Sequence, residues 1–187
     1  MSATLFAMIS VSLDGFIEDE AKAIDWMTED RSIDALHTQN LREIEAMVFG
    51  RTAHAAIAGY WQQAEAGSMA MTPDLVAQTE RMTSLPKYVL THGPEQTGWA
   101  NSHAVDIDRI KQIKAQSVQP VAVFAGAGAI QSVLTAGLID ELRLIVYPVS
   151  IGGGTPLFPR DRAHRQFELT RVEQFESGAI LQCYRLL

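Results

Sequence analysis

One segment limits the possible folds of this chain more than any other. Val121–Phe124 is a continuous apolar run, and the small-residue turn Ala125–Gly128 follows it directly. Beyond the turn, Ile130, Val133 and Leu134 recur at helical spacing. An uninterrupted apolar strand is typical of a parallel sheet covered on both faces. The segment therefore predicts a strand, a tight turn and a helix, which is the repeating unit of an α/β fold.

The rest of the chain continues this alternation. Further strands are predicted at Leu5–Val11, Glu45–Gly50, Lys87–Thr91, His103–Val105 and Glu141–Val149. Helices are predicted between Thr28 and Ile44, over Arg51–Trp61, over Pro73–Leu85 after the N-cap Thr72, and over Asp108–Gln116. Gly137 is expected to end the helix after Gly128 in a left-handed conformation.

The C-terminal part of the sequence adds antiparallel strands to the predicted sheet. Strands near Phe167–Phe175 and Ala179–Leu186 flank the turn Glu176–Gly178, which predicts an antiparallel hairpin. No repeat or linker divides the 187 residues. We therefore expect a single α/β domain over residues 1–187, with a mixed, mostly parallel sheet flanked by helices and a C-terminal antiparallel hairpin.

Charge and cysteine content narrow the classes of partner. The net charge is −7 and the basic residues form no stripe, so neither nucleic acid nor an anionic membrane is expected as a partner. Cys183 is the only cysteine, which excludes an intramolecular disulfide and indicates a reducing, cytoplasmic compartment. The five histidines show no ligand spacing, so no metal is expected.

Three positions at predicted strand ends are candidates for phosphate binding. Residues 126–129 (Gly-Ala-Gly-Ala) join a buried strand to a helix, where backbone N–H groups can approach an anion. The alternative is that these small residues only permit tight packing, since the full G-x-G-x-x-G pattern is absent. Arg51 and Thr52 follow Gly50 in the same way, and Arg51 could otherwise be a solvated side chain. The pair Thr91 and His92 is a third such position, although a Thr-His pair that leads into a Gly-Pro turn is more often just turn chemistry.

A polar loop near the N-terminus is the candidate substrate side. It contains Asp14, Phe16 and Ile17, and Trp26 follows it. The two aromatic rings could wall a pocket for a flat ligand, or they could be core residues. Asp14 could act in catalysis or bind its own backbone. Residues 152–154, three glycines, predict a structural or lid-supporting loop rather than a phosphate site.

Taken together, these motifs resemble the dihydrofolate-reductase-like family, and in particular the reductase (C-terminal) domain of the bifunctional riboflavin-biosynthesis deaminase/reductase. The resemblance runs over nearly the whole chain. Its motifs, in order, are Val11–Ile17, Ile24–Met27, Val48–Thr52, Leu85–Val89, Trp99–Asn101, Phe124–Gly128, Gly137–Leu144, Tyr147–Val149 and Ile151–Phe158.

The resemblance implies a homodimer that binds NADPH across the carboxyl edge of the sheet and reduces a small molecule. The implied cofactor contacts are Gly50, Arg51 and Thr52 at the phosphates, Thr91 and His92 near the adenosine 2′-phosphate, and Gly126, Ala127, Gly128, Ala129 and Ile130 around the pyrophosphate. The implied substrate contacts are Asp14, Phe16, Ile17, Trp26, Tyr147 and Pro148.

The sequence also departs from both relatives within that family. Dihydrofolate reductase holds its substrate with a carboxylate a few residues after the loop tryptophan, and neither Glu29 nor Asp30 falls at that offset. The riboflavin reductase has an early loop lysine, whereas this chain has none before Lys22. The substrate is thus left open.

These considerations give three hypotheses. The first is an NADPH-dependent reductase that transfers a hydride to a C=N or C=O bond, with Asp14, Asp30, Tyr147 or a water as the source of the proton. The second is a protein that binds NADPH or another phosphorylated ligand without turnover. The third is an assembly protein whose hairpin, Phe167–Leu186, forms a dimer edge.

Overall fold

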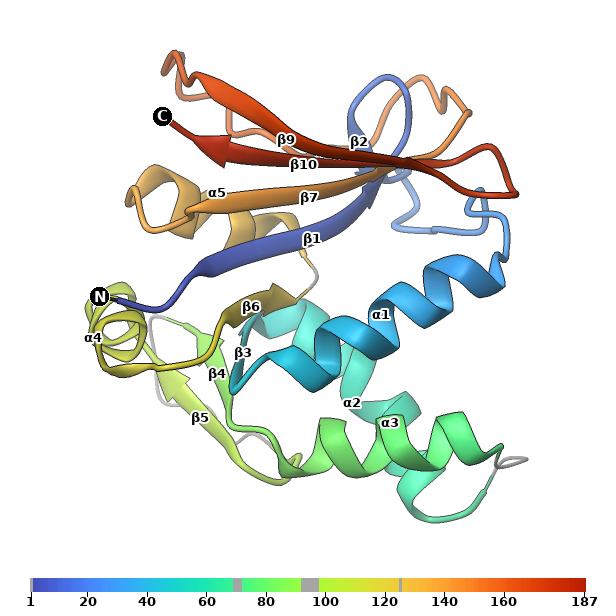
Figure 1. Ribbon diagram of the computed structural model, residues 1–187, viewed down its shortest axis with the longest axis vertical. Helices are drawn as coiled ribbons and strands as arrows, with labels where there is room; N and C mark the ends of the chain where they lie inside the picture. The colour runs from blue at the N-terminus through green and yellow to red at the C-terminus, as the bar shows by residue number, and fades with distance from the viewer. Residues whose placement is uncertain (1, 69–71, 92–97, 125) are drawn as a thin grey trace.

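An eight-stranded sheet runs through the molecule, with strand order β5-β4-β3-β6-β1-β7-β10-β9 (Figure 1). The computed structural model describes residues 2–68, 72–91, 98–124 and 126–187. The strands are β1 (Leu5–Val11), β2 (Phe16–Glu18), β3 (Ala46–Gly50), β4 (Lys87–Leu90), β5 (Ser102–Val105), β6 (Val121–Phe124), β7 (Glu141–Val146), β8 (Thr155–Pro156), β9 (Phe167–Gln174) and β10 (Ile180–Leu186). The helices are α1 (Arg31–Glu43), α2 (Arg51–Glu65), α3 (Pro73–Ser84), α4 (Ile107–Gln116) and α5 (Ala127–Thr135).

The direction of the strands confirms the predicted mixed sheet. From β5 to β7 all neighbouring strands are parallel, with Ala7 of β1 opposite Val123 of β6 on one side and Leu142 of β7 on the other. β10 is antiparallel to β7, and β9 is antiparallel to β10. The carboxyl ends of the parallel strands therefore share one edge of the sheet, which is where ligands bind in open α/β sheets.

Each face of the sheet has its own apolar core. Phe6, Met47 and Phe49 belong to the core covered by α1, α2 and α3, and each is at most 2% exposed. Leu5 and Val123 belong to the core covered by α4 and α5. Figure 1 shows the two groups of helices on opposite sides of the strands. Burial on both faces explains why the inner strands have no polar alternation.

Two local features differ from the prediction. β7 ends at Val146 rather than Val149, because the Tyr147 N–H still donates to Val11 but Val149 turns away and accepts from the Leu13 N–H at 2.7 Å. A separate antiparallel ribbon of β2 and β8 was not predicted, since its strands are only three and two residues long.

Helix ends follow the predicted rules more closely. The Thr72 side chain accepts from the Leu75 N–H and caps α3. Gly137 has a φ of +66° and follows the last turn of α5, as expected for a left-handed C-cap. Within the described ranges, no helix is long and apolar enough to span a bilayer, and no group of three or more His, Cys, Asp or Glu side chains is arranged for a metal.

Candidate functional site

The helices α2 and α5 begin side by side at the carboxyl edge of the sheet. β3 and β6 are neighbours, and α2 and α5 follow them directly, starting from the N-cap glycines Gly50 and Gly126. A Cβ placed on Gly126 would lie 3.0 Å from Ala53 Cβ, and one placed on Gly50 would lie 3.5 Å from Ala129 N. The missing side chain at Gly126 is what allows the two helix starts to lie this close, whereas a Cβ at Gly50 would make an ordinary contact.

Neither of these helix starts has a side-chain cap. Gly50 and Gly126 make no side-chain cap hydrogen bond, and neither helix has an acidic residue in its first turn. The other three helices are capped by Asp30, Thr72 and Asp106. The first N–H groups of a helix lack intrahelical acceptors and lie at its positive end. The paired starts are therefore suited to bind an anion, and a pyrophosphate has the size to span both.

The backbone at the start of α5 requires glycine. Gly126 adopts φ +88° and ψ 123°, a conformation that side-chain-bearing residues rarely adopt. At Gly128 a Cβ would meet no described heavy atom within 4 Å, so the space in front of the first turn is open. This geometry fits a phosphate group approaching the amides of residues 127–129.

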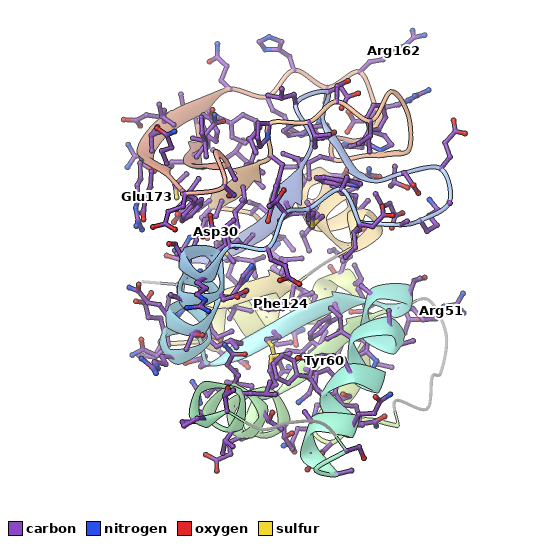
Figure 2. The ribbon with its side chains drawn as sticks, turned by 90° about the vertical axis from the view of Figure 1, so that its right-hand side faces the viewer. Asp30, Arg51, Tyr60, Phe124, Arg162 and Glu173 are labelled. Carbon is purple, nitrogen blue, oxygen red and sulfur yellow. The ribbon has the colours of Figure 1, made fainter. Side chains whose placement is uncertain are left out.

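The predicted cofactor residues divide into exposed and buried ones. Arg51 and Thr52 are exposed in the first turn of α2, and Figure 2 shows Arg51 extending into solvent. Among the described residues, no hydrogen bond or ion pair involves the Arg51 side chain. Ala129 and Ile130 are at most 2% exposed, so only their main chain is available to a ligand. Thr91 is half-buried beyond β4, and its N–H donates to Val105; His92 lies outside the described residues.

Asp14 connects the N-terminal loop to the loop after β7. Its carboxylate accepts from Ser12 Oγ at 2.6 Å, from Ser150 Oγ at 2.8 Å and from the Gly152 N–H at 2.8 Å. The Ser12 hydroxyl makes the largest contribution to a pKa held well below its usual range, and the Gly152 N–H adds to it. The Asp14 carboxylate therefore ties residues 12–14 to residues 150–152.

Asp30 is engaged in a similar way on the other side of the loop. It caps α1 by accepting from the Ser32 N–H, and its second oxygen accepts from the Ser177 N–H in the β9–β10 turn at 2.8 Å. These bonds, chiefly those with Ser177, lower the pKa of Asp30 to about 2. Both carboxylates proposed from the sequence as proton donors are therefore occupied by structural hydrogen bonds.

Tyr147 and Trp26 form the aromatic pair of the site. Their ring centroids are 5.8 Å apart with an interplanar angle of 87°, and Tyr147 is 5% exposed. Burial raises the pKa of Tyr147, a hydrogen bond with Ser10 opposes the rise, and Asp30 and Asp34 add to it. The indole Nε1 of Trp26 is buried and has no hydrogen-bond partner among the described residues.

Three predicted substrate contacts lie elsewhere. Ile17 is 5% exposed and packs in the core beneath α4 and α5, because β2 is pulled toward β8. Its role as a pocket residue stays a prediction. Phe16 pairs with Pro156 in the β2–β8 ribbon. Pro148 is exposed, and its Cγ lies 3.6 Å from where a Cβ of Gly178 would be, next to the hairpin turn.

Several partly buried apolar side chains that the sequence reasoning missed pack, like Trp26, against the α1–α3 core. They are Leu36, Ile57, Trp61, Phe124 and Val149. Figure 2 shows Phe124 between α1 and α2. Leu36, Ile57 and Trp61 lie on helices, whereas Phe124 ends β6 and Val149 follows β7, so no single sequence pattern marks the set.

A separate groove on the molecule contains none of the predicted site residues. It has a volume of about 480 Å³ and is lined by Tyr88, His103, Ala104, Val105, Asp106 and Arg109. The Tyr88 and His103 rings lie 6.0 Å apart at 34°. This groove is therefore distinct from the paired helix starts.

Comparison with known proteins places these features in a family. The family model of the RibD C-terminal domain matches residues 3–181. The uncharacterized protein YyaP of Bacillus subtilis (strain 168) is 26% identical over 182 residues, which cover 94% of this chain and 91% of YyaP.

Two solved structures support the fold. A protein of Shewanella sp. PV-4 assigned to riboflavin biosynthesis superimposes with a TM-score of 0.74 at 20% identity, covering 100% of this chain and 99% of the other. Dihydrofolate reductase from Enterococcus faecalis, complexed with NADP(H), gives a TM-score of 0.59 at 15% identity, with 100% and 99% coverage. The chain therefore has the dihydrofolate-reductase-like fold.

Proposed function

We propose, because the chain belongs to the RibD C-terminal domain family, that it is an NADPH-dependent reductase of a small organic molecule. The observation that carries the proposal is the pair of uncapped helix starts at Gly50 and Gly126. Their free amides and positive dipole ends supply an anion site at the edge of the sheet where α/β proteins bind ligands.

The residues present fit the cofactor. The amides at the start of α5 would hold the pyrophosphate, and Arg51 and Thr52 would contact phosphate oxygens from the first turn of α2. Thr91 and His92 would lie near the 2′-phosphate. When bound, NADPH would supply a hydride for a C=N or C=O bond. The protein's part is to bind, orient and exclude water.

On the substrate side, Trp26 and Tyr147 are the residues best placed to contact a ligand. Asp14 and Asp30 hold the surrounding loops, because each is ionised and hydrogen-bonded within the protein. Tyr147 keeps its hydroxyl proton at neutral pH, since its pKa is raised by burial. The proton would thus come from Tyr147 or from a water molecule.

Asp14 and Asp30 both accept hydrogen bonds from within the protein. This favours one alternative, a protein that binds NADPH without turnover. NADPH oxidation with any of a panel of small carbonyl and imine compounds would separate the two functions. Turnover above the rate of the protein-free control supports the reductase. Tight NADPH binding with no turnover across the panel supports the binding protein.

A homodimer is also part of the proposal. β9 is an edge strand, and its Leu169 and Val172 are 52% and 56% exposed. Exposed apolar side chains on an unpaired edge favour association with a second copy. Light scattering after size-exclusion chromatography would give twice the mass of the 20.5 kDa chain if this is correct.

The decisive experiment for the proposed function is a calorimetric titration with NADPH and, separately, NADH. We expect tighter binding of NADPH. Arg51→Ala should weaken NADPH about tenfold or more, because a charge-assisted hydrogen bond contributes about 1.5–3 kcal/mol. A larger loss for NADPH than for NADH places Arg51 at the 2′-phosphate, whereas equal losses place it at the pyrophosphate.

Arg31→Ala is the matched control for this titration. Arg31 is also an exposed arginine at the first position of a helix, but α1 is capped by Asp30. We expect no change in NADPH affinity. Failure of the unmodified protein to bind either nucleotide would remove the reductase proposal.

A further inference from the structure

His54 is the first buried side chain of α2. Arg51 and Thr52 in the same turn are exposed, whereas His54 is 5% exposed. Ala58, one turn later, is 8% exposed. Residues one turn apart lie on the same face of a helix. The stripe by which α2 packs on the sheet therefore begins at an imidazole, within the turn that carries the uncapped amides.

The imidazole belongs to an aromatic cluster that adjoins both uncapped helix starts. Its centroid lies 5.7 Å from the ring of Phe49, the residue before the N-cap of α2. The Phe49 ring lies 5.7 Å from that of Phe124, the last residue of β6. Trp99 completes the cluster, with its ring 5.6 Å from His54 and 6.2 Å from Phe49. These rings connect the end of β3, the end of β6 and the first turn of α2.

A hydrogen bond links the same imidazole to the edge strand of the sheet. His54 Nε2 and Ser102 Oγ of β5 share a hydrogen bond of 2.9 Å. In the sheet, β4 lies between β3 and β5. The bond therefore ties α2 to a strand two places away from β3, the strand that α2 follows. It fixes the first turn against the β3–β5 part of the sheet.

Ring packing alone would not fix this turn so closely. Apolar contacts are non-directional, so a phenyl ring in place of His54 would hold the helix on the sheet without defining its orientation. A hydrogen bond weakens steeply when its angle departs from linear. The bond with Ser102 therefore restricts rotation and sliding of the first turn more than the neighbouring rings do.

The orientation of this turn decides where the proposed anion donors point. No side chain caps α2, and its first turn has no acidic residue. Ala53, the residue before His54, is also the contact to the second helix start, since a Cβ on Gly126 would lie 3.0 Å from Ala53 Cβ. Donors that are held in place before a ligand arrives bind it with a smaller entropic cost. A shift of the first turn would thus misplace the amides of α2 relative to those of α5.

We propose that His54 is a positioning residue for the cofactor. Its hydrogen bond with Ser102 holds the first turn of α2 in the orientation in which the two helix starts bind phosphates together. The inference rests on the proposed function for the identity of the ligand, and it requires no contact between His54 and that ligand.

A double-mutant cycle, read by calorimetric titration with NADPH, tests the proposal. His54→Phe keeps a ring and removes the hydrogen bond, and Ser102→Ala removes its partner. We expect each substitution to raise the Kd about fivefold, as for the loss of one neutral hydrogen bond. The double variant should bind no more weakly than either single variant, because all three lack the same bond. NADH should lose affinity by the same factor, since both nucleotides carry the pyrophosphate.

Two further variants separate positioning from a general effect on the fold. His54→Gln keeps a polar group that can bond Ser102, so its NADPH affinity should return to within about twofold of the unmodified protein. His103→Phe is the matched control, because His103 is the exposed neighbour of Ser102 in β5 and its ring contacts Tyr88 instead. We expect no change in NADPH affinity from this control.

The outcomes distinguish the inference from the proposed function. A lower Tm with unchanged NADPH affinity in His54→Phe and Ser102→Ala would assign the bond to stability alone and overturn the inference. Additive losses in the double variant would overturn it too, because the two side chains would then act separately. If the unmodified protein binds neither nucleotide, the proposed function fails, and the inference fails with it.

Discussion

The N-termini of the five helices differ in a way that separates folding from function. α1, α3 and α4 each begin at a side chain that accepts a backbone N–H, which stabilises a helix by about 0.5–2 kcal/mol. α2 and α5 begin at glycines without this bond, and they are the two that meet at the carboxyl edge of the sheet. At the two helix starts that touch, no capping side chain accepts from the first backbone N–H groups, so these amides are available to a ligand.

The largest effect is expected from Gly126→Ala. The substitution forces a side chain into a φ of +88° and places a Cβ 3.0 Å from Ala53. Strain of this kind costs about 1–3 kcal/mol of stability. We also expect NADPH affinity to fall by more than an order of magnitude, because the start of α5 must shift away from α2. Chemical denaturation and calorimetry measure the two losses.

Gly128→Ala is the matched substitution, two residues after Gly126 in the first turn of α5. Its Cβ meets no described atom within 4 Å, and alanine in a helix is favoured over glycine by about 0.5–1 kcal/mol. Stability should therefore rise while NADPH binds more weakly, since the methyl group enters the space assigned to the phosphate. A stable variant with unchanged NADPH affinity would contradict that assignment.

The next prediction concerns Lys87, whose side chain donates hydrogen bonds to carbonyl oxygens at the C-terminal end of α3. Its Nζ is fully buried, donates to Leu85 O at 2.8 Å and Thr83 O at 3.1 Å, and lies 4.5 Å from the centre of the Trp99 ring. Burial lowers the pKa of Lys87 to about 8 from 10.5. Between these pH values the unfolded chain binds more protons than the folded chain, so stability must rise with pH.

Urea unfolding at a series of pH values from 7 to 11 would measure this rise. We expect about 3 kcal/mol from Lys87, gained as the pH increases from about 8 to 10.5. Lys87→Met should remove this increment and leave the contribution of the tyrosines. An identical pH profile in both proteins would show that the buried amine is not titrating.

The smallest effect is expected at a capped helix start. Asp106→Ala removes the bond from the Arg109 N–H, 2.8 Å long, at the start of α4. Stability should fall by about 1 kcal/mol with no change in NADPH affinity. Asp106→Asn should restore most of the loss, because asparagine caps as well as aspartate. If the substitution also lowered NADPH affinity, the capped start of α4 would affect ligand binding as well, which would contradict the separation of capped from uncapped helix starts.

Much of the fold was predictable because strong local patterns agreed with the tertiary structure. The apolar run at Val121–Phe124 and the left-handed Gly137 are set by burial and by backbone sterics, which act on sequence directly. The β2–β8 ribbon was not predictable, since its residues are too few for any periodicity. Its pairing is decided by tertiary contacts instead.

The candidate site was predictable only in part, for the same reason. The glycines at the ends of β3 and β6 are visible in the sequence, and the structure brings their helices together. Asp14 was singled out from the sequence as a possible site residue, but two of its hydrogen-bond partners, Ser150 and Gly152, are far away along the chain. The burial of Ile17 in the opposite core depends on long-range packing that no local pattern encodes.

The amides at the starts of α2 and α5 belong to the main chain, and this has a consequence for how the molecule can change. Almost any residue supplies the same N–H group, so the proposed phosphate site tolerates substitution wherever the backbone of the two helix starts is kept, above all at Gly126 with its positive φ. The proposed substrate side depends instead on side chains such as Trp26 and Tyr147, which a single substitution alters. If the chain is the reductase proposed above, such substitutions would change the compound that it reduces and leave the cofactor site as it is.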